Sequence, residues 1–139
     1  VKYRKQNQIE RSQRKIMRAK RINHPGWQSE DFYDTPGVET AIFKPSYLDY
    51  LSEKAEVLLA RYRQDKNRKD LETVLILHDL MDEAIRMIRK TYFLLDDKRG
   101  FQEVSADIYE SAIAANFLAS RDIDDSKYLE KCFYFSEAS

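Results

Sequence analysis

The residues most able to do chemistry in this chain are the cations of its N-terminal segment. The first 21 residues contain nine Lys or Arg and one acidic residue, Glu10, so the segment carries a formal charge of +8. The remaining 118 residues hold 15 basic and 23 acidic side chains, a charge of −8. A basic arm on an acidic body indicates a polyanionic partner, a charged protein groove, or an arm folded back on its own domain. The candidate contact residues are Lys2, Arg4, Lys5, Arg11, Arg14, Lys15, Arg18, Lys20 and Arg21.

Polar uncharged side chains are interspersed among these cations. Lys and Arg neutralise phosphates, and Gln, Asn or Ser side chains can reach base edges, so the mixture suits nucleic-acid binding with a strong salt dependence. The segment resembles arginine-rich helices that fold in RNA grooves in composition alone, and this implies no family. We therefore predict a non-enzymatic helical binding module whose arm engages RNA or DNA. The interspersed residues are Gln6, Asn7, Gln8, Ser12 and Gln13.

The arm also permits other partners. An accessory or structural subunit of a larger assembly, with arm and linker docked on acidic partner surfaces, is the alternative, and a homo-oligomer stays open. A basic zipper is excluded because Pro25-Gly26 stands where the zipper would begin. A membrane surface needs a larger apolar face than Ile9, Ile16 and Met17 supply, so no membrane partner is expected.

Two groups of carboxylates offer a possible metal site. The spacing Glu53-x-x-Glu56, followed by Asp79-x-x-Asp82-Glu83, is similar to the paired acidic motifs of all-α nucleotide pyrophosphatases, which hold Mg²⁺ in a bundle. Residues three apart share a helix face and can chelate. Glu53 and Glu56 lie off the apolar stripe of their helix, however, so solvated outer charges explain them better. An enzyme of this type is a third hypothesis, and we predict no catalytic residue, metal or cofactor.

The histidines and the cysteine do not form a recognisable site. His78 falls on an apolar stripe, where a hydrogen-bonded core residue is expected. Two histidines and one cysteine are too few for a zinc or di-iron centre. The run 122–126 lacks the Gly and Glu of a calcium loop and is interpreted as a helix cap. Cys132, expected to be a buried thiol, fits a reducing compartment, so we predict the cytoplasm and leave organelle import open.

The elements that must position these residues are predicted to be helical. All three prolines and two of the three glycines lie between residues 25 and 45, which indicates an extended linker over 22–45. Its Trp27, Phe32 and Tyr33 are expected either to pin the linker to the body or to dock a partner. No apolar stretch is long enough to span a membrane, and no signal peptide is expected.

Apolar periodicity predicts four helices after the linker. The first begins at Ser46 as N-cap and ends near 66, and a turn within 64–70 is favoured over one continuous helix. The most periodic segment, 71–95, is the expected central helix, followed by 101–120 and 127–135. In the first of these the predicted core stripe is Leu48, Leu51, Ala55, Leu58 and Tyr62; in the third it is Val104, Ile108, Ala112, Ala115 and Leu118.

The fold class predicted is therefore all-α. Three long helices and a short C-terminal one form a small acidic bundle over 46–139, preceded by the linker and by a basic helical arm over 1–21. The arm has helix-forming composition and no Pro or Gly, but too few apolar residues for a core face. We expect it to fray alone and to be ordered by something acidic.

Overall fold

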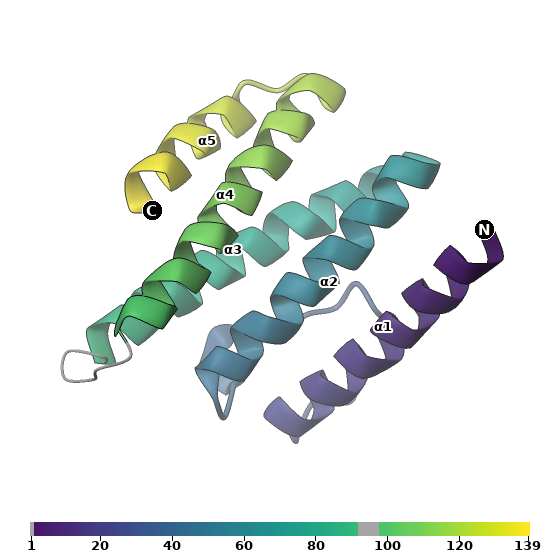
Figure 1. Ribbon diagram of the computed structural model, residues 1–139, viewed down its shortest axis with the longest axis vertical. Coiled ribbons are helices and arrows are strands. Elements are labelled where there is room, and N and C mark those ends of the chain that lie inside the picture. Colours follow the sequence, from purple (N-terminus) through teal and green to yellow (C-terminus); the bar gives the residue numbers. More distant parts are fainter. Residues whose placement is uncertain (1, 92–97) are drawn as a thin grey trace. The chain divides into compact units, whose positions relative to one another are not determined.

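The computed structural model describes residues 2–91 and 98–139, with side chains given for residues 6–91 and 100–139. The described residues contain five α-helices, one 3-10 turn and no strand, so the all-α prediction is confirmed (Figure 1). The chain divides into two units, Val1–Leu80 and Met81–Ser139, with the boundary inside α3. The elements are α1 Lys2–Asn23, η1 Val38–Thr40, α2 Lys44–Asp65, α3 Arg68–Thr91, α4 Lys98–Asp122 and α5 Lys127–Ala138.

In the first unit, α1 and α2 lie side by side and antiparallel (Figure 1). The end of α1 meets the start of α2, where Asn23 hydrogen-bonds the backbone of Phe43. Further along the pair, Lys15 of α1 forms an ion pair with Glu53 of α2. The linker connects the end of α1 to the start of α2, so the two helices form an antiparallel helical hairpin.

The expectation that α1 contributes nothing to a core is wrong. Ile16 is 1% exposed and Lys20 is fully buried. Together with Ile9 and Asn23 they follow one face of the helix, and the aliphatic stem of Lys20 supplies apolar area that its charge conceals in the sequence. In this structure α1 packs against α2, a helix of its own chain.

Helix α2 begins three residues earlier than predicted. Phe43 is the residue at the N-cap and Pro45 lies in the first turn, so Ser46 is not the cap. Proline is tolerated there because the first N–H groups of a helix have no intrahelical acceptor. The predicted stripe from Leu48 to Tyr62 is buried throughout, which confirms it.

A short turn separates α2 from α3, as favoured over one continuous helix. Lys66 adopts a left-handed conformation at φ 55°, and its N–H donates to Tyr62 O at 2.7 Å. Asn67 Oδ1 then accepts the N–H of Lys69 at 3.0 Å. These two hydrogen bonds satisfy backbone groups at the end of α2 and at the start of α3, in a turn that contains neither Gly nor Pro.

In the second unit, α4 and α5 form an antiparallel hairpin that packs with the last part of α3. Cys132 of α5 reaches the carbonyl oxygen of Ile113 of α4 at 3.4 Å and is half-buried rather than buried. The buried face of α4 includes Ser105, and Val104, predicted to point inward, is 45% exposed. At the start of α4 the buried face is therefore shifted by one residue from the predicted face. Ser105 occupies the inward position, and its hydroxyl donates to Phe101 O.

The predicted end of the central helix at 92–95 and the first two residues of the predicted turn at 96–100 lie outside the described residues; residues 98–100 belong to α4, so the turn does not extend over them. Within the described part, α3 ends at Thr91 and α4 begins at Lys98, three residues before its predicted start. None of the described helices is long and apolar enough to cross a membrane.

Candidate nucleic-acid interface

The C-terminal end of α1 is fixed by paired hydrogen bonds. Asn23 Oδ1 accepts the N–H of Phe43 at 2.8 Å, and Asn23 Nδ2 donates to Phe43 O at 3.0 Å. The N–H of Ile42 donates to Asn23 O at 3.0 Å. We call these Asn23–Phe43 hydrogen bonds the Asn23 clip. Next to it, buried His24 forms hydrogen bonds with Thr40 Oγ1 at 2.8 Å and with Tyr50 Oη at 2.6 Å. These contacts tie α1, the linker and α2 together at one point.

Two buried lysines hold the linker against the helices. Lys20 Nζ of α1 and Lys54 Nζ of α2 donate to the same acceptor, Asp34 O, at 3.2 and 3.1 Å. Lys54 also donates to Thr35 Oγ1 at 2.9 Å. Burial is the main cause that lowers the pKa of both lysines, to about 7 for Lys54, where the charge of Lys20 adds to the effect.

The linker aromatics predicted to pin the linker or dock a partner each contact a cation of the first unit. The Trp27 ring lies 5.8 Å from Lys20 Nζ, and its Nε1 is buried without a hydrogen-bond acceptor among the described residues. The Phe32 ring lies 5.0 Å from Lys54 Nζ. Tyr33 donates its hydroxyl to the buried carboxylate of Asp70 at 2.7 Å. All three rings are half-buried, a geometry that fits the pinning role.

The opposite side of α1 presents a cationic face. Arg11, Arg14 and Arg18, at spacings of three and four, lie about 140–160° around the helix from Ile16 at 100° per residue. All three are exposed, and none forms an ion pair with a carboxylate within the described residues. Because the packing face and the cationic face lie on opposite sides, folding leaves these guanidinium groups available.

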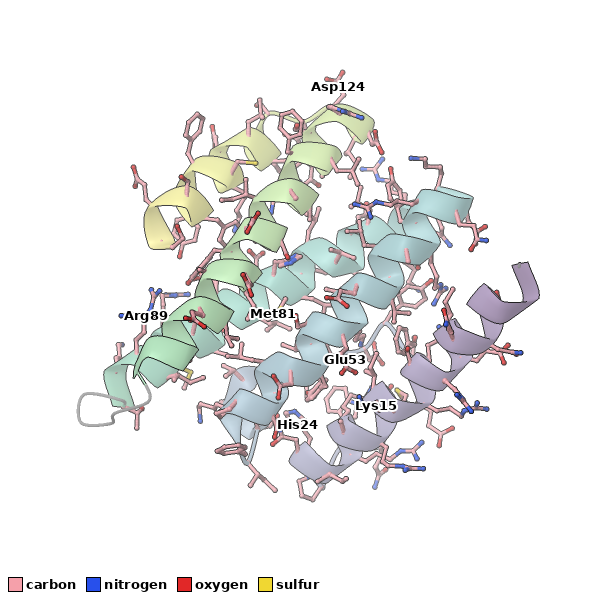
Figure 2. All side chains as sticks on the ribbon, in the orientation of Figure 1. Lys15, His24, Glu53, Met81, Arg89 and Asp124 are labelled. Carbon is pink, nitrogen blue, oxygen red and sulfur yellow. The ribbon has the colours of Figure 1, made fainter. Side chains whose placement is uncertain are left out.

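Two other arm cations have acidic partners. Lys15 Nζ lies 3.2 Å from Glu53 Oε1, and Figure 2 shows the two residues on adjacent helices. Arg21 Nη2 lies 3.5 Å from Glu30 Oε1. Both pairs are largely exposed, so each contributes at most about 1 kcal/mol to stability and yields readily to a competing anion.

Of the remaining predicted contact residues, Lys20 does not join this face. Lys20 is buried on the linker, so it has no route to a phosphate in this structure. The side chains of Lys2, Arg4 and Lys5 lie outside the described part. The cationic face is therefore defined here by Arg11, Arg14 and Arg18, flanked by Lys15 and Arg21.

A groove of about 520 Å³ runs between α1 and α2 beside this face. Gln8 and Ile9 line it from α1, and Val57, Ala60 and Gln64 from α2. Its lining combines apolar side chains, two amides and the charged side chains of Glu56 and Arg63. Nothing in the sequence indicates this groove, because it depends on the antiparallel register of two helices that the linker joins.

The charge difference between arm and body persists at the level of the units. The first unit holds sixteen Lys or Arg and twelve Asp or Glu, a net charge of +4. The second holds eight and twelve, a net charge of −4. A polyanion would therefore be attracted to the first unit and repelled by the second.

The carboxylates considered for a metal site have other surroundings. Glu53 pairs with Lys15, and Glu56 lines the groove. Asp82 is buried and accepts the hydroxyls of Tyr109 and Tyr134 at 2.5 and 2.7 Å. Within the described residues, no three His, Cys, Asp or Glu side chains are grouped so that they could hold a metal.

His78 is a core residue, as predicted. It is 3% exposed, and its Nδ1 lies 3.0 Å from Val74 O, which makes Nδ1–H the donor. Burial lowers its pKa to about 4. A neutral imidazole held against a backbone carbonyl has a structural role.

Comparison with protein-family models, with curated proteins and with solved structures finds no match to this chain.

Proposed function

We propose that the protein is a non-enzymatic nucleic-acid-binding module and that the cationic face of α1 is its phosphate-binding surface. The observation that carries this proposal is the exposed row of Arg11, Arg14 and Arg18, which pair with no carboxylate of the described residues, on a helix anchored by its opposite face. Arginine suits this role because its planar guanidinium donates two parallel hydrogen bonds to a phosphate.

The anchoring of α1 favours binding. An isolated basic helix would lose conformational entropy when it ordered on a ligand. Here, packing of Ile16 and the Asn23 clip hold the helix in advance. The Cα atoms of Arg11 and Arg18 are separated by about 10 Å along the axis, a length that reaches several phosphates of one strand.

The test is binding of a labelled oligonucleotide as a function of salt. We expect the affinity of the full chain to fall steeply between 50 and 200 mM salt. Replacing Arg11, Arg14 and Arg18 together by Gln should reduce the slope of log K against log salt by about 2 to 3, since each lost phosphate contact removes about 0.7 to 0.9.

The matched control removes an equal number of positive charges, three, from the second unit. Lys90, Arg121 and Lys131 are exposed residues of α3, α4 and α5. Their replacement by Gln should leave the salt slope unchanged. Equal losses in both triple variants, or no binding by the wild-type chain, would contradict the proposal.

A second candidate, an accessory subunit of a larger assembly, is favoured by one observation. Phe117 of α4 and Leu129 and Phe133 of α5 are 51, 44 and 74% exposed. Large apolar side chains gathered on two adjacent helices are typical of protein interfaces. If this candidate holds, sedimentation should show self-association or a co-purifying protein partner that is lost on Phe133→Ser, with the arginines of α1 dispensable.

A further inference from the structure

The groove between α1 and α2 has the composition of a site for a flat, partly polar group. Ile9, Val57 and Ala60 supply apolar walls, and the amides of Gln8 and Gln64 supply donors and acceptors. Its volume of about 520 Å³ lies within the range of small-ligand sites. Such a combination fits an aromatic heterocycle with hydrogen-bonding edges.

A second hollow, of about 330 Å³, adjoins the groove and is cationic. Arg11 and Arg14 line it together with Asn7 and Gln8. Gln8 lines both hollows, so the polar side chain at their border belongs to each. An apolar site and a cationic site in direct continuity match the two halves of a nucleotide.

We infer that the groove receives the base of an unpaired nucleotide, with its phosphate held by Arg11 and Arg14 in the adjoining hollow. This inference rests on the proposed function and narrows it to single-stranded nucleic acid. A base within a duplex is stacked on both faces, so its ring could not enter the groove. An unpaired base can be splayed out and can contact side chains with its faces and edges.

Charge within the groove selects the kind of base. Glu56 and Arg63 line it from α2. The carboxylate of Glu56 accepts hydrogen bonds and the guanidinium of Arg63 donates them, so together they favour a base edge that carries an amino group beside a ring acceptor. Cytosine presents such a donor at N4, whereas uracil presents an acceptor at the same position. We therefore expect cytosine to be bound in preference to uracil.

The experiment measures binding of labelled oligo-C, labelled oligo-U and a mixed-sequence duplex to the full chain. Ala60→Leu fills the groove from an exposed helical position and keeps good helix propensity. Ala114→Leu, at an exposed position of α4, is the matched control. Glu56→Gln keeps the shape of the side chain and removes its charge.

The wild-type chain should bind oligo-C about fivefold or more tighter than oligo-U, because one good edge contact discriminates by at least that factor. Ala60→Leu should weaken single-strand binding about tenfold, as expected for the loss of contact with a base face, and leave duplex binding unchanged. Glu56→Gln should reduce the preference for oligo-C. Ala114→Leu should change nothing.

Two failures are distinguishable. If Ala60→Leu and Glu56→Gln bind all three probes like the wild type, while the arginine triple variant loses its salt slope, the groove inference is overturned and the proposed function stands. If the wild-type chain binds none of the probes, both are overturned. Thermal melting of each variant identifies a loss of binding that arises from unfolding, and Glu56→Gln, a near-isosteric change, then decides.

Discussion

The ammonium groups of Lys20 and Lys54 converge on a single backbone oxygen, that of Asp34. Two like charges meet there in a buried position, and the faces of Trp27 and Phe32 lie close to them. The arrangement fastens α1, α2 and the linker at one atom. Its cost is electrostatic, because burial disfavours the charged form of both lysines and the charge of Lys20 further disfavours that of Lys54.

Replacing Lys54 by Met should flatten the pH dependence of stability in the alkaline range. The pKa of Lys54 is about 7 in the folded chain and 10.5 in its unperturbed state. Between these values the unfolded chain holds a proton that the folded chain has released, so the free energy of unfolding rises with pH. Below pH 7 both states are protonated and this contribution is lost.

Urea unfolding between pH 6.5 and 9.5 provides the measurement for this prediction. The rise attributable to Lys54 is on the order of 2 to 3 kcal/mol over that interval, and it should be missing in Lys54→Met. Lys44→Met, a half-exposed position in the first turn of the same helix, is the control. Parallel curves for Lys54→Met and the wild type would contradict the prediction.

His78 should stay neutral well below the usual range for histidine. Burial lowers its pKa to about 4, so between pH 4 and 6.5 the unfolded chain binds a proton that the folded chain does not. Stability should fall as the pH drops through this window, and His78→Leu should fall less. In an NMR titration, the imidazole resonance of His78 should remain constant down to about pH 5. A midpoint near 6.5 would be incompatible with its buried contact.

Asn23→Ala should destabilise the first unit by about 1 to 3 kcal/mol. The substitution removes both side-chain hydrogen bonds to Phe43 and leaves the Phe43 N–H without its acceptor, while Phe43 O keeps the N–H of Tyr47. Asn67→Ala, which removes one exposed bond to Lys69, should cost less. Urea unfolding compares the two. If the Asn23 clip also holds α1 in the position that exposes the cationic face, Asn23→Ala should weaken oligonucleotide binding in proportion to the loss of folded α1.

The two tyrosines that donate to Asp82 should differ in their contributions to stability. Tyr109 is 1% exposed and Tyr134 is 44% exposed. Tyr109→Phe leaves one carboxylate oxygen without its donor in a buried site, so it should cost about 1 to 3 kcal/mol. Tyr134→Phe should cost less, because water can replace its hydroxyl. Equal losses, or a larger loss for Tyr134→Phe, would argue against this account.

Periodicity in the sequence was sufficient to identify the buried face of α2. From Leu48 to Tyr62 the apolar residues recur every three or four positions, and all are buried. His78 was placed correctly for the same reason, since it stands within such a row. These assignments depend only on the geometry of one helix.

The packing face of α1 could not be recognised in this way. Two of its buried residues, Lys20 and Asn23, are polar, so no apolar stripe appears in the sequence. Their burial requires acceptors from Asp34 and Phe43, which the linker brings from 14 and 20 residues away. Only a folded chain places those backbone groups within hydrogen-bond distance.

By itself the sequence determined the helices, the excess of positive charge in the first 21 residues and the absence of a recognisable catalytic motif, because these follow from local spacing and composition. The tertiary structure decided which cations remain available. It buried Lys20, paired Lys15 and Arg21 with carboxylates, and left Arg11, Arg14 and Arg18 exposed beside a groove. The physical reason is that a helix can pack only one of its faces, and the register of α1 against α2 determines which face that is.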